Sequence, residues 1–305
     1  MDFYPSCLEK GQRSEKALGL AMAEMYVNGV STRRVERITK ELYGLQVSST
    51  QISRLSKLLD EDLGKFRERP LGKIAYLYLD ARYEKVREEG VVRDLALFTA
   101  TGVNEEGCRE VLGISCGLSE AEVHWREFLG TLLKRGLKGI ELIISDDHAG
   151  LKKARRAVLP GTPWQRCCFH LAQNAQHYAP TQVMRKEIAG ALRDIYQAPS
   201  QEEAKVRLKQ TVDKYEKKAA RFSNWLEENC EEGLTFYQFS PEHWRRIRTN
   251  NATERLNQEI KRRTRVARLF PNAASCLRLA TAVVMEIHEE WVSGRKYLSL
   301  DKTQA

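Results

Sequence analysis

Between residues 14 and 62, apolar side chains recur every three or four positions. This is the period of an amphipathic helix, so the segment predicts several short helices. One of them covers residues 33–43, and Ser31 or Thr32 is suited to cap its first turn. Short helices joined by a glycine-containing turn are compatible with a helix-turn-helix that reads DNA, but two helices that only pack together have the same pattern.

The pattern changes after residue 70, where short apolar runs replace the helical period. The run IAYLYL at 74–79 is apolar on both faces, as in a strand buried within a sheet. Two runs closed by glycine-containing turns, 92–103 and 109–118, predict two more strands. Residues 140–144 and 164–168 are the remaining strand candidates.

Helices are predicted between these strands. Residues 119–136 are amphipathic, and Ser119 with Glu122 has the spacing of a capping box. A second helix is expected over 149–158. The order of three strands, helix, strand, helix and strand predicts an α/β fold. Its mixed sheet would be ribonuclease H-like, with an antiparallel meander first and helices flanking the sheet.

The rest of the chain is charged and helical in pattern, with no strand candidate between 181 and 232. We therefore expect an N-terminal helical region at 1–68 and the first part of a ribonuclease H-like core at 69–180. An all-helical insertion is expected at 181–243, followed at 244–305 by C-terminal helices that complete the core.

Composition narrows the class of protein. Apolar residues make up 42% of the 305 positions and charged residues 30%, which is typical of a water-soluble globular protein. No run of about 18 uncharged apolar residues is present, which argues against a membrane span. The N-terminus lacks the apolar stretch of a signal peptide, and the seven scattered cysteines include no CxxC pair. We expect a protein of the reducing cytoplasm.

The net charge of +9 is concentrated in one stretch. Between residues 244 and 268 there are nine Lys or Arg and only two acids. A solvated helix face would explain such a run, but contact with the phosphates of DNA is the interpretation that we favour. The candidate DNA-binding residues are Arg245, Arg246, Arg248, Arg255, Lys261, Arg262, Arg263 and Arg265.

Two aspartates follow apolar strand candidates. Asp80 comes directly after the run at 74–79, and Asp146 follows the run at 140–144 within SDDH. Each could simply cap the next turn. Two carboxylates at neighbouring strand ends would repel each other, however, and a divalent cation removes that conflict. Mg²⁺ prefers such oxygen ligands, and Mn²⁺ would also suit them.

A third acid lies in the basic stretch. Glu254 is expected near the start of a helix, with Asn257 on the same face. Glu259 is expected on a different face of the helix from Glu254. Arg255 and Arg263 lie four residues before and after it, so ion pairing would account for an acid at this position. Glu254 is therefore the preferred third ligand and Glu259 the substitute. Three carboxylates that hold two metal ions would suit an in-line displacement at phosphorus.

Four segments carry a resemblance to a known family: YLYLDARYEKVR, LIISDDHAGL, WQRCCFHLAQN and TNNATERLNQEIKRRTRVARLFPN. They resemble the Mutator-type transposases of bacterial insertion sequences, and the likeness spans almost the whole chain. The resemblance implies a DDE triad on a ribonuclease H-like fold, with Asp80, Asp146 and Glu254 as the acids. Asp147 matches a variable position and is not counted as a ligand.

The same resemblance adds a Cys-x-x-His signature, which Cys167 and His170 supply. Two such ligands cannot by themselves make a closed zinc site, so packing or DNA contact is the expected role. His148 and His170 are candidates for orienting the acids or a phosphate, with a structural role as the alternative. The chain begins near FYPS, whereas family members carry a further N-terminal segment before it, so we expect either a truncated copy or the product of a shifted start codon.

The resemblance also implies the partners and the reaction. They are double-stranded DNA with terminal inverted repeats, target DNA, and further copies of this chain assembled on DNA near the bacterial nucleoid. Two alternatives stay open. A nuclease on the same sheet would need the triad but no strand transfer. A DNA-binding regulator without transposition activity would inhibit the full-length enzyme.

Overall fold

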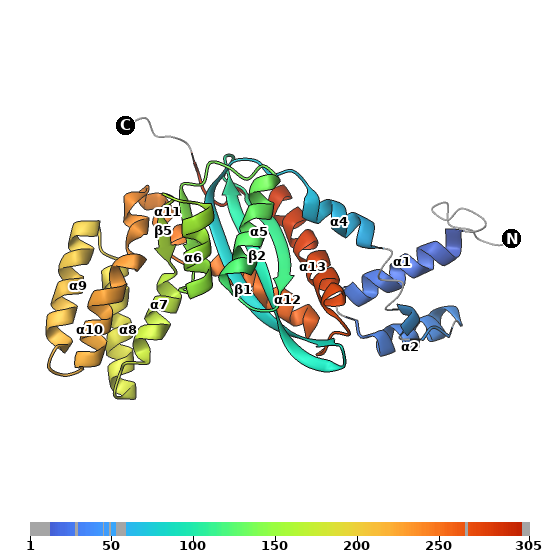
Figure 1. The fold of residues 1–305 in the computed structure, drawn as a ribbon, viewed down its shortest axis with the longest axis horizontal. Coiled ribbons are helices and arrows are strands. Elements are labelled where there is room, and N and C mark those ends of the chain that lie inside the picture. Colours follow the sequence, from blue (N-terminus) through green and yellow to red (C-terminus); the bar gives the residue numbers. More distant parts are fainter. Residues whose placement is uncertain are drawn as a thin grey trace.

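We describe the protein from a computed structural model. The structure describes residues 13–27, 30–44, 46–48, 50–52, 59–265 and 268–300. Its centre is one five-stranded sheet (Figure 1). The strands are β1 (Ile74–Glu88), β2 (Val91–Asn104), β3 (Arg109–Gly117), β4 (Leu142–Ser145) and β5 (Trp164–Arg166).

The strand order is β3-β2-β1-β4-β5. Strands β1, β2 and β3 form an antiparallel meander, whereas β4 and β5 run parallel to β1. The predicted α/β class, the mixed sheet and all five strand positions are confirmed. The two parallel strands are short and fully buried, as expected for strands with helices on both faces.

Strand β1 differs from its prediction in one respect. It does not end before Asp80 but continues to Glu88, and its whole length pairs with β2. The second half alternates charged and apolar side chains, and a tight hairpin joins it to β2. Asp80 therefore lies in the middle of a strand, opposite Thr99.

Helices cover both faces of the sheet (Figure 1). On one face, α5 (Glu122–Lys134) and α6 (Ala149–Val158) pack around the fully buried Trp125. On the other face lie α4 (Asp60–Glu68), α12 (Asn251–Thr264) and α13 (Ala273–Ser293), which share a second core with the meander. Helix α5 begins behind Ala121 without a side-chain cap, so the expected capping role of Ser119 is wrong.

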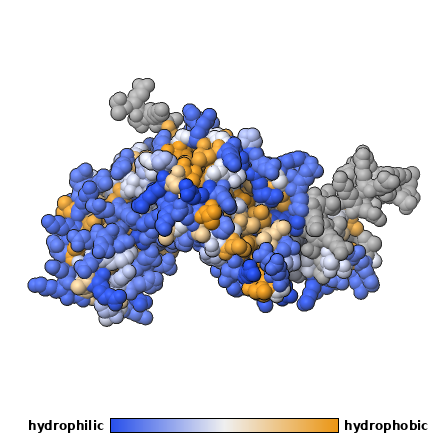
Figure 2. All heavy atoms as spheres, in the orientation of Figure 1, coloured by the Kyte–Doolittle hydropathy of each residue, from blue (hydrophilic) through white to orange (hydrophobic). Residues whose placement is uncertain are grey.

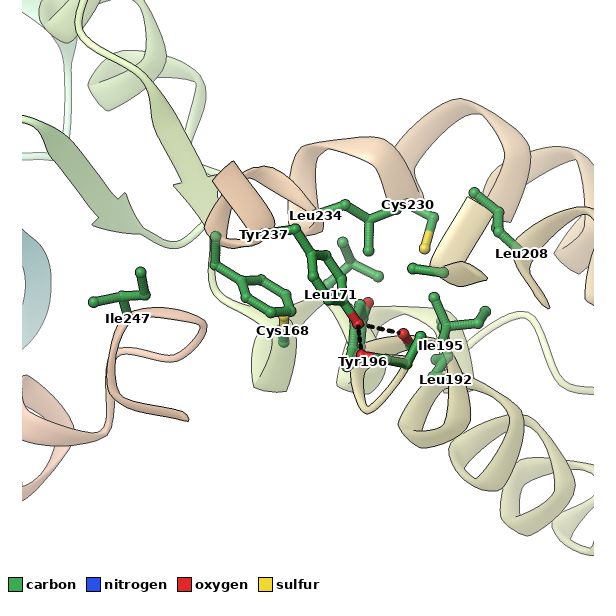
Figure 3. Close-up of a cluster of buried hydrophobic side chains, with 14 of the residues drawn as sticks. Cys168, Leu171, Leu192, Ile195, Tyr196, Leu208, Cys230, Leu234, Tyr237 and Ile247 are labelled. Carbon is green, nitrogen blue, oxygen red and sulfur yellow. Dashed lines mark hydrogen bonds between the residues drawn. The ribbon is translucent and has the colours of Figure 1, made fainter. Parts of the chain in front are cut away.

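Beyond β5 the chain is helical, as predicted. The elements are α7 (Cys168–Gln176), α8 (Gln182–Tyr196), α9 (Gln201–Tyr215), α10 (Ala220–Asn229), the 3-10 helices η2 (Cys230–Gly233) and η3 (Thr235–Gln238), and α11 (Pro241–Ile247). Their apolar side chains form a core that continues to the edge of the sheet. Figure 3 shows Tyr237 at its centre, where its hydroxyl donates to the carbonyls of Ile195 (2.9 Å) and Ala198 (3.1 Å). The outer face of these helices is largely hydrophilic (Figure 2).

At the other end of the molecule lie α1 (Arg13–Val27) and α2 (Thr32–Tyr43) (Figure 1). Ser31 accepts a hydrogen bond from the amide of Arg34, which confirms the predicted cap. Part of the next expected helix, residues 53–58, lies outside the described residues. DNA reading by this region stays a prediction. Among the described helices, none combines the length and apolar character needed to cross a membrane.

Candidate active site

Asp80 lies within β1, and Asp146 is the first residue after the neighbouring parallel strand β4. Tyr78 pairs with Ile144 in the β1–β4 register. Two residues further on, Asp80 in β1 lies alongside Asp146, just past the end of β4. Because both steps are even, the two side chains are directed to the same face of the sheet. The predicted convergence of these two aspartates thus follows from the register.

The Asp80 side chain is held from two directions. The Ala81 amide donates to Oδ1 (2.9 Å), and Asn257 Nδ2 donates to Oδ2 (2.6 Å). Burial raises the pKa of the Asp80 carboxyl to about 6, and the nearby charge of Asp146 adds to the rise, although both hydrogen bonds and His170 oppose it. Asn257 was predicted to share a helix face with Glu254. In the structure its side chain hydrogen-bonds to Asp80.

The neighbouring acids Asp146 and Asp147 have different surroundings. Asp146 accepts a hydrogen bond from the Asp147 amide (2.7 Å), and its side chain is 43% exposed. Asp147 instead pairs with Lys152 (2.7 Å) and with the buried Arg166 (3.0 Å), which also contacts Glu232. Asp147 is therefore engaged in an ion-pair network that links β4, α6 and β5 to η2. This arrangement supports Asp146 as the functional member of the pair.

Helix α12 carries Glu254 across the sheet. The Asn250 side chain donates to the Leu79 carbonyl (3.1 Å) and makes no capping hydrogen bond to the helix. One turn further, the hydroxyls of Thr253 and Thr101 are 3.0 Å apart. With the bond from Asn257 to Asp80, these contacts fix the first two turns of α12 over β1 and β2. The carboxyl oxygen Oε1 of Glu254 is buried and has no hydrogen-bond partner.

The Cys-x-x-His pair lies where β5 passes into α7. The potential ligand atoms of Cys167, His170 and Glu254 all lie within 4.8 Å of one another. His170 Nδ1 is also 3.9 Å from Asp146 Oδ1. A hydrogen bond with Cys167, with the charges of Asp146 and Asp80, raises the pKa of His170 to about 9. His170 therefore carries a positive charge among the acids at neutral pH.

The oxygens of Asp80, Asp146 and Glu254 do not themselves form a group within that distance. The structure brings the two aspartates together and places Glu254 across His170 from Asp146. His148 lies outside this arrangement, with Nδ1 3.7 Å from Glu120. The donor set nearest Glu254 is thus sulfur and nitrogen, which residue spacing did not predict.

The basic stretch divides into groups with different surroundings. Arg263 is buried and forms an ion pair with Glu286 (2.9 Å). Glu259 forms an ion pair with Arg262 (2.8 Å), not with Arg255 or Arg263 as the spacing suggested. Lys261 and Arg265 are exposed. The inward orientation of Arg263 removes it from the residues that can meet DNA in this structure.

The other arginines of the stretch surround a cavity of about 220 Å³, which we call the arginine pocket. It is lined by Arg109, Arg245, Arg246, Arg248, Thr249, Asn251, Arg255 and Tyr297. Within the described parts of the chain, no ion pair joins these five guanidinium groups to a carboxylate. The guanidinium groups of Arg109 and Arg246 lie 4.6 and 4.7 Å from the Tyr297 ring centre. Arg109 and Tyr297 were not predicted, because neither lies in the basic stretch.

The site is thus a set of acids on a mixed α/β sheet, beside a pocket of positive charge, which is the arrangement of a protein that acts on a polyanion. Comparison with known proteins defines the family. Residues 2–294 match the model of the family described as "Transposase, Mutator family", and the chain belongs to this family.

Several relatives are transposases of insertion sequences. The chain is 52% identical over 302 residues to the transposase for IS406 of Burkholderia multivorans, which covers 98% of this chain and 78% of that protein. It is 44% identical to the transposase for ISRM5 of Rhizobium meliloti, covering 98% and 75%. It is 39% identical to the transposase for IS256 in transposon Tn4001 of Staphylococcus aureus, covering 98% and 78%.

Proposed function

We propose that this protein is a DDE transposase that cleaves and joins the DNA strands of an insertion sequence. The observation that carries the proposal is the parallel register, which brings Asp80 and Asp146 together beneath the helix that bears Glu254. Membership of the Mutator transposase family supports the reaction class. The sheet order and its antiparallel meander support assignment to the ribonuclease H-like folds.

In this proposal residues 69–180 and 244–305 form the catalytic core, and 181–243 form a helical insertion. The N-terminal region, 1–68, would add DNA contacts. The core shared by α7–α11 and the sheet edge supports an insertion that is packed firmly against the catalytic part.

The donor chemistry fits divalent cations at the two aspartates. Their carboxylates are hard oxygen ligands on adjacent strands, and Asn257 with the Ala81 amide orients Asp80. Asp80, Asp146 and Glu254 would hold two Mg²⁺ or Mn²⁺ ions. When bound, such ions lower the pKa of the attacking water or 3′-hydroxyl and stabilise the leaving oxygen. His170, charged at neutral pH, offsets the repulsion between the acids.

The arginine pocket supplies the DNA contacts in this proposal. Five guanidinium groups that share one cavity repel one another, and backbone phosphates would relieve that repulsion. The exposed Lys261, Arg262 and Arg265 extend the same basic surface. The partners would be double-stranded DNA with terminal inverted repeats and target DNA, bound by a homo-oligomer.

Cleavage and strand transfer of a labelled terminal-repeat duplex in Mg²⁺ test the proposal. Asp80→Asn, Asp146→Asn and Glu254→Gln are expected to abolish both reactions while DNA binding is retained. Glu259→Gln is the matched control on α12, because this exposed acid pairs only with Arg262 among the described contacts. Cleavage without strand transfer would instead indicate a nuclease. DNA binding by a wild-type protein that does neither would indicate a regulator.

A further inference from the structure

Two buried polar atoms, one on Glu254 and one on His170, have no hydrogen bond. Glu254 Oε1 and His170 Nδ1 are both enclosed, and neither has a hydrogen bond. Leaving a buried polar atom unsatisfied costs about 1–3 kcal/mol. Both atoms belong to side chains of the group in which the ligand atoms of Cys167, His170 and Glu254 lie within 4.8 Å of one another. Unsatisfied atoms gathered in this way indicate a ligand that binds among them.

The donors identify the kind of ligand. A thiolate, an imidazole and a carboxylate together are suited to Zn²⁺, whereas Mg²⁺ prefers oxygen alone. Only the deprotonated side chains bind the ion, so the protons of the Cys167 thiol and the His170 imidazolium are released to solvent as it binds. Three protein ligands leave the fourth tetrahedral position for water, as in an open zinc site. The Cys-x-x-His pair alone is too small for such a site. Glu254, from a distant part of the sequence, supplies the third ligand that the pair lacks.

The two halves of this group are held in place before any ion binds. Cys167 caps α7, and its amide donates to the Ser145 carbonyl (2.8 Å). The Asn250 amide donates to Cys167 Sγ (3.4 Å). This amide lies at the start of α12, the helix that carries Glu254. The contact therefore ties the sulfur ligand to the helix of the carboxylate ligand.

We infer that the protein binds one Zn²⁺ through Cys167, His170 and Glu254, and that this ion competes with the Mg²⁺ ions for the Glu254 carboxylate. The competition rests on the proposed function, because it matters only if Glu254 is the third acid of the transposase. With zinc bound, the enzyme is inactive, because Glu254 coordinates Zn²⁺ together with Cys167 and His170 and is not available to Mg²⁺. A chelator that removes zinc restores Mg²⁺-supported cleavage.

Cobalt provides a direct readout of the sulfur ligand. Titrating the metal-free full-length protein with Co²⁺ is expected to produce a thiolate-to-cobalt charge-transfer band that saturates at one ion and is displaced by Zn²⁺. Cobalt held only by carboxylates gives no such band. Cys167→Ser should abolish the band. His170→Gln and Glu254→Gln should weaken Zn²⁺ binding by more than about 100-fold, because loss of an outer-shell partner alone costs up to about that much.

Cys168→Ser is the matched control. This adjacent thiol is equally buried but lies in the hydrophobic cluster beside Tyr237, with its Sγ 3.4 Å from the Gly233 carbonyl (Figure 3). The control variant should keep the band. If Cys167→Ser does not fold, Glu254→Gln carries the test, because its side chain is partly exposed and tolerates an isosteric amide.

The two proposals can fail separately. A wild-type protein without the charge-transfer band, or a band that survives Cys167→Ser, overturns the zinc site even if Asp80→Asn abolishes cleavage. Conversely, a band that depends on Cys167 together with cleavage that survives Asp80→Asn leaves the zinc site standing and overturns the proposed triad. Cleavage in Mg²⁺ that is unaffected by saturating Zn²⁺ overturns the competition.

Discussion

Replacing Asp80 with asparagine is expected to stabilise the metal-free protein while abolishing its activity. Burial raises the pKa of this carboxyl from 3.8 to about 6. The folded protein therefore holds the negative charge less easily than the unfolded chain does. At about 1.4 kcal/mol per pKa unit, the charge opposes folding at neutral pH by about 3 kcal/mol.

The amide removes this charge but also loses a hydrogen bond. Asparagine can still accept from Asn257, whereas its NH₂ group cannot accept from the Ala81 amide, which costs about 1 kcal/mol. Partial exposure of the side chain weakens the charge effect further. We expect a net gain of about 1–2 kcal/mol at pH 7.5, which corresponds to a rise in Tm of about 2–6 °C.

The pH dependence gives the sign of the effect. The pKa of the Asp80 carboxyl is raised from 3.8 in the unfolded chain to about 6 in the folded protein. The penalty is therefore complete only well above pH 6, shrinks as the pH falls through the folded pKa, and is mostly lost near pH 4, where the folded carboxyl is protonated and the unfolded one is about half ionised. Thermal melts of the wild type and Asp80→Asn in EDTA, at pH 7.5 and pH 4, measure it. Added Mg²⁺ should raise the Tm of the wild type more than that of the variant. An unchanged or lower Tm of the variant at pH 7.5 would refute the argument.

Three further changes separate structural from functional roles. Asp147→Asn should keep cleavage but lower the free energy of unfolding by about 1–2 kcal/mol. The loss is limited because the buried Arg166 keeps its ion pair with Glu232 when it loses the one with Asp147. A loss of cleavage would show that Asp147 is the functional acid. Arg255→Ala should lower the slope of log K against log salt for DNA binding by about 1. Arg263→Gln should leave that slope unchanged and lower the Tm. A slope for Arg255→Ala equal to that of the wild type would exclude the arginine pocket as a DNA contact. Burial lowers the pKa of His288 to about 4, so stability should fall by about 1–2 kcal/mol between pH 7 and pH 5, and His288→Gln should remove most of that loss. Melts at the two pH values that show the same loss in both proteins would contradict this last expectation.

The sequence was informative where structure is local. Apolar runs at 74–79 and 140–144 predicted buried strands because full burial leaves a continuous hydrophobic signature. The continuation of β1 beyond Asp80 was missed, because its charged second half is stabilised by pairing with β2 rather than by its own apolar character. The capping role of Ser119 was predicted wrongly, because α5 starts at Glu122, too far along for Ser119 to be its N-cap residue, and Ala121 takes that position without a side-chain hydrogen bond.

The site shows the same division. Asp80 and Asp146 could be proposed from the sequence because a carboxylate directly after an apolar run is visible in the chain. The grouping of Cys167, His170 and Glu254 depends on where α12 crosses the sheet, which residue spacing does not encode. The inward orientation of Arg263 depends on Glu286 of α13, and the place of Arg109 in the arginine pocket depends on the start of β3. These contacts are tertiary and have no local signal.

The mid-strand position of Asp80 limits how this gene can change in length. From Tyr76 to Glu88, β1 pairs with β2 in one continuous register, and Tyr76–Tyr78 also pair with β4, so this part of the strand has no irregularity that could absorb an added residue. Alternate side chains point to opposite faces, so inserting or deleting one codon between Tyr76 and Leu79 would turn Asp80 into the hydrophobic layer around Trp125 and direct an apolar neighbour toward Asn257. Copies of the element with such a single-codon change should therefore be inactive even when every proposed catalytic residue is still encoded.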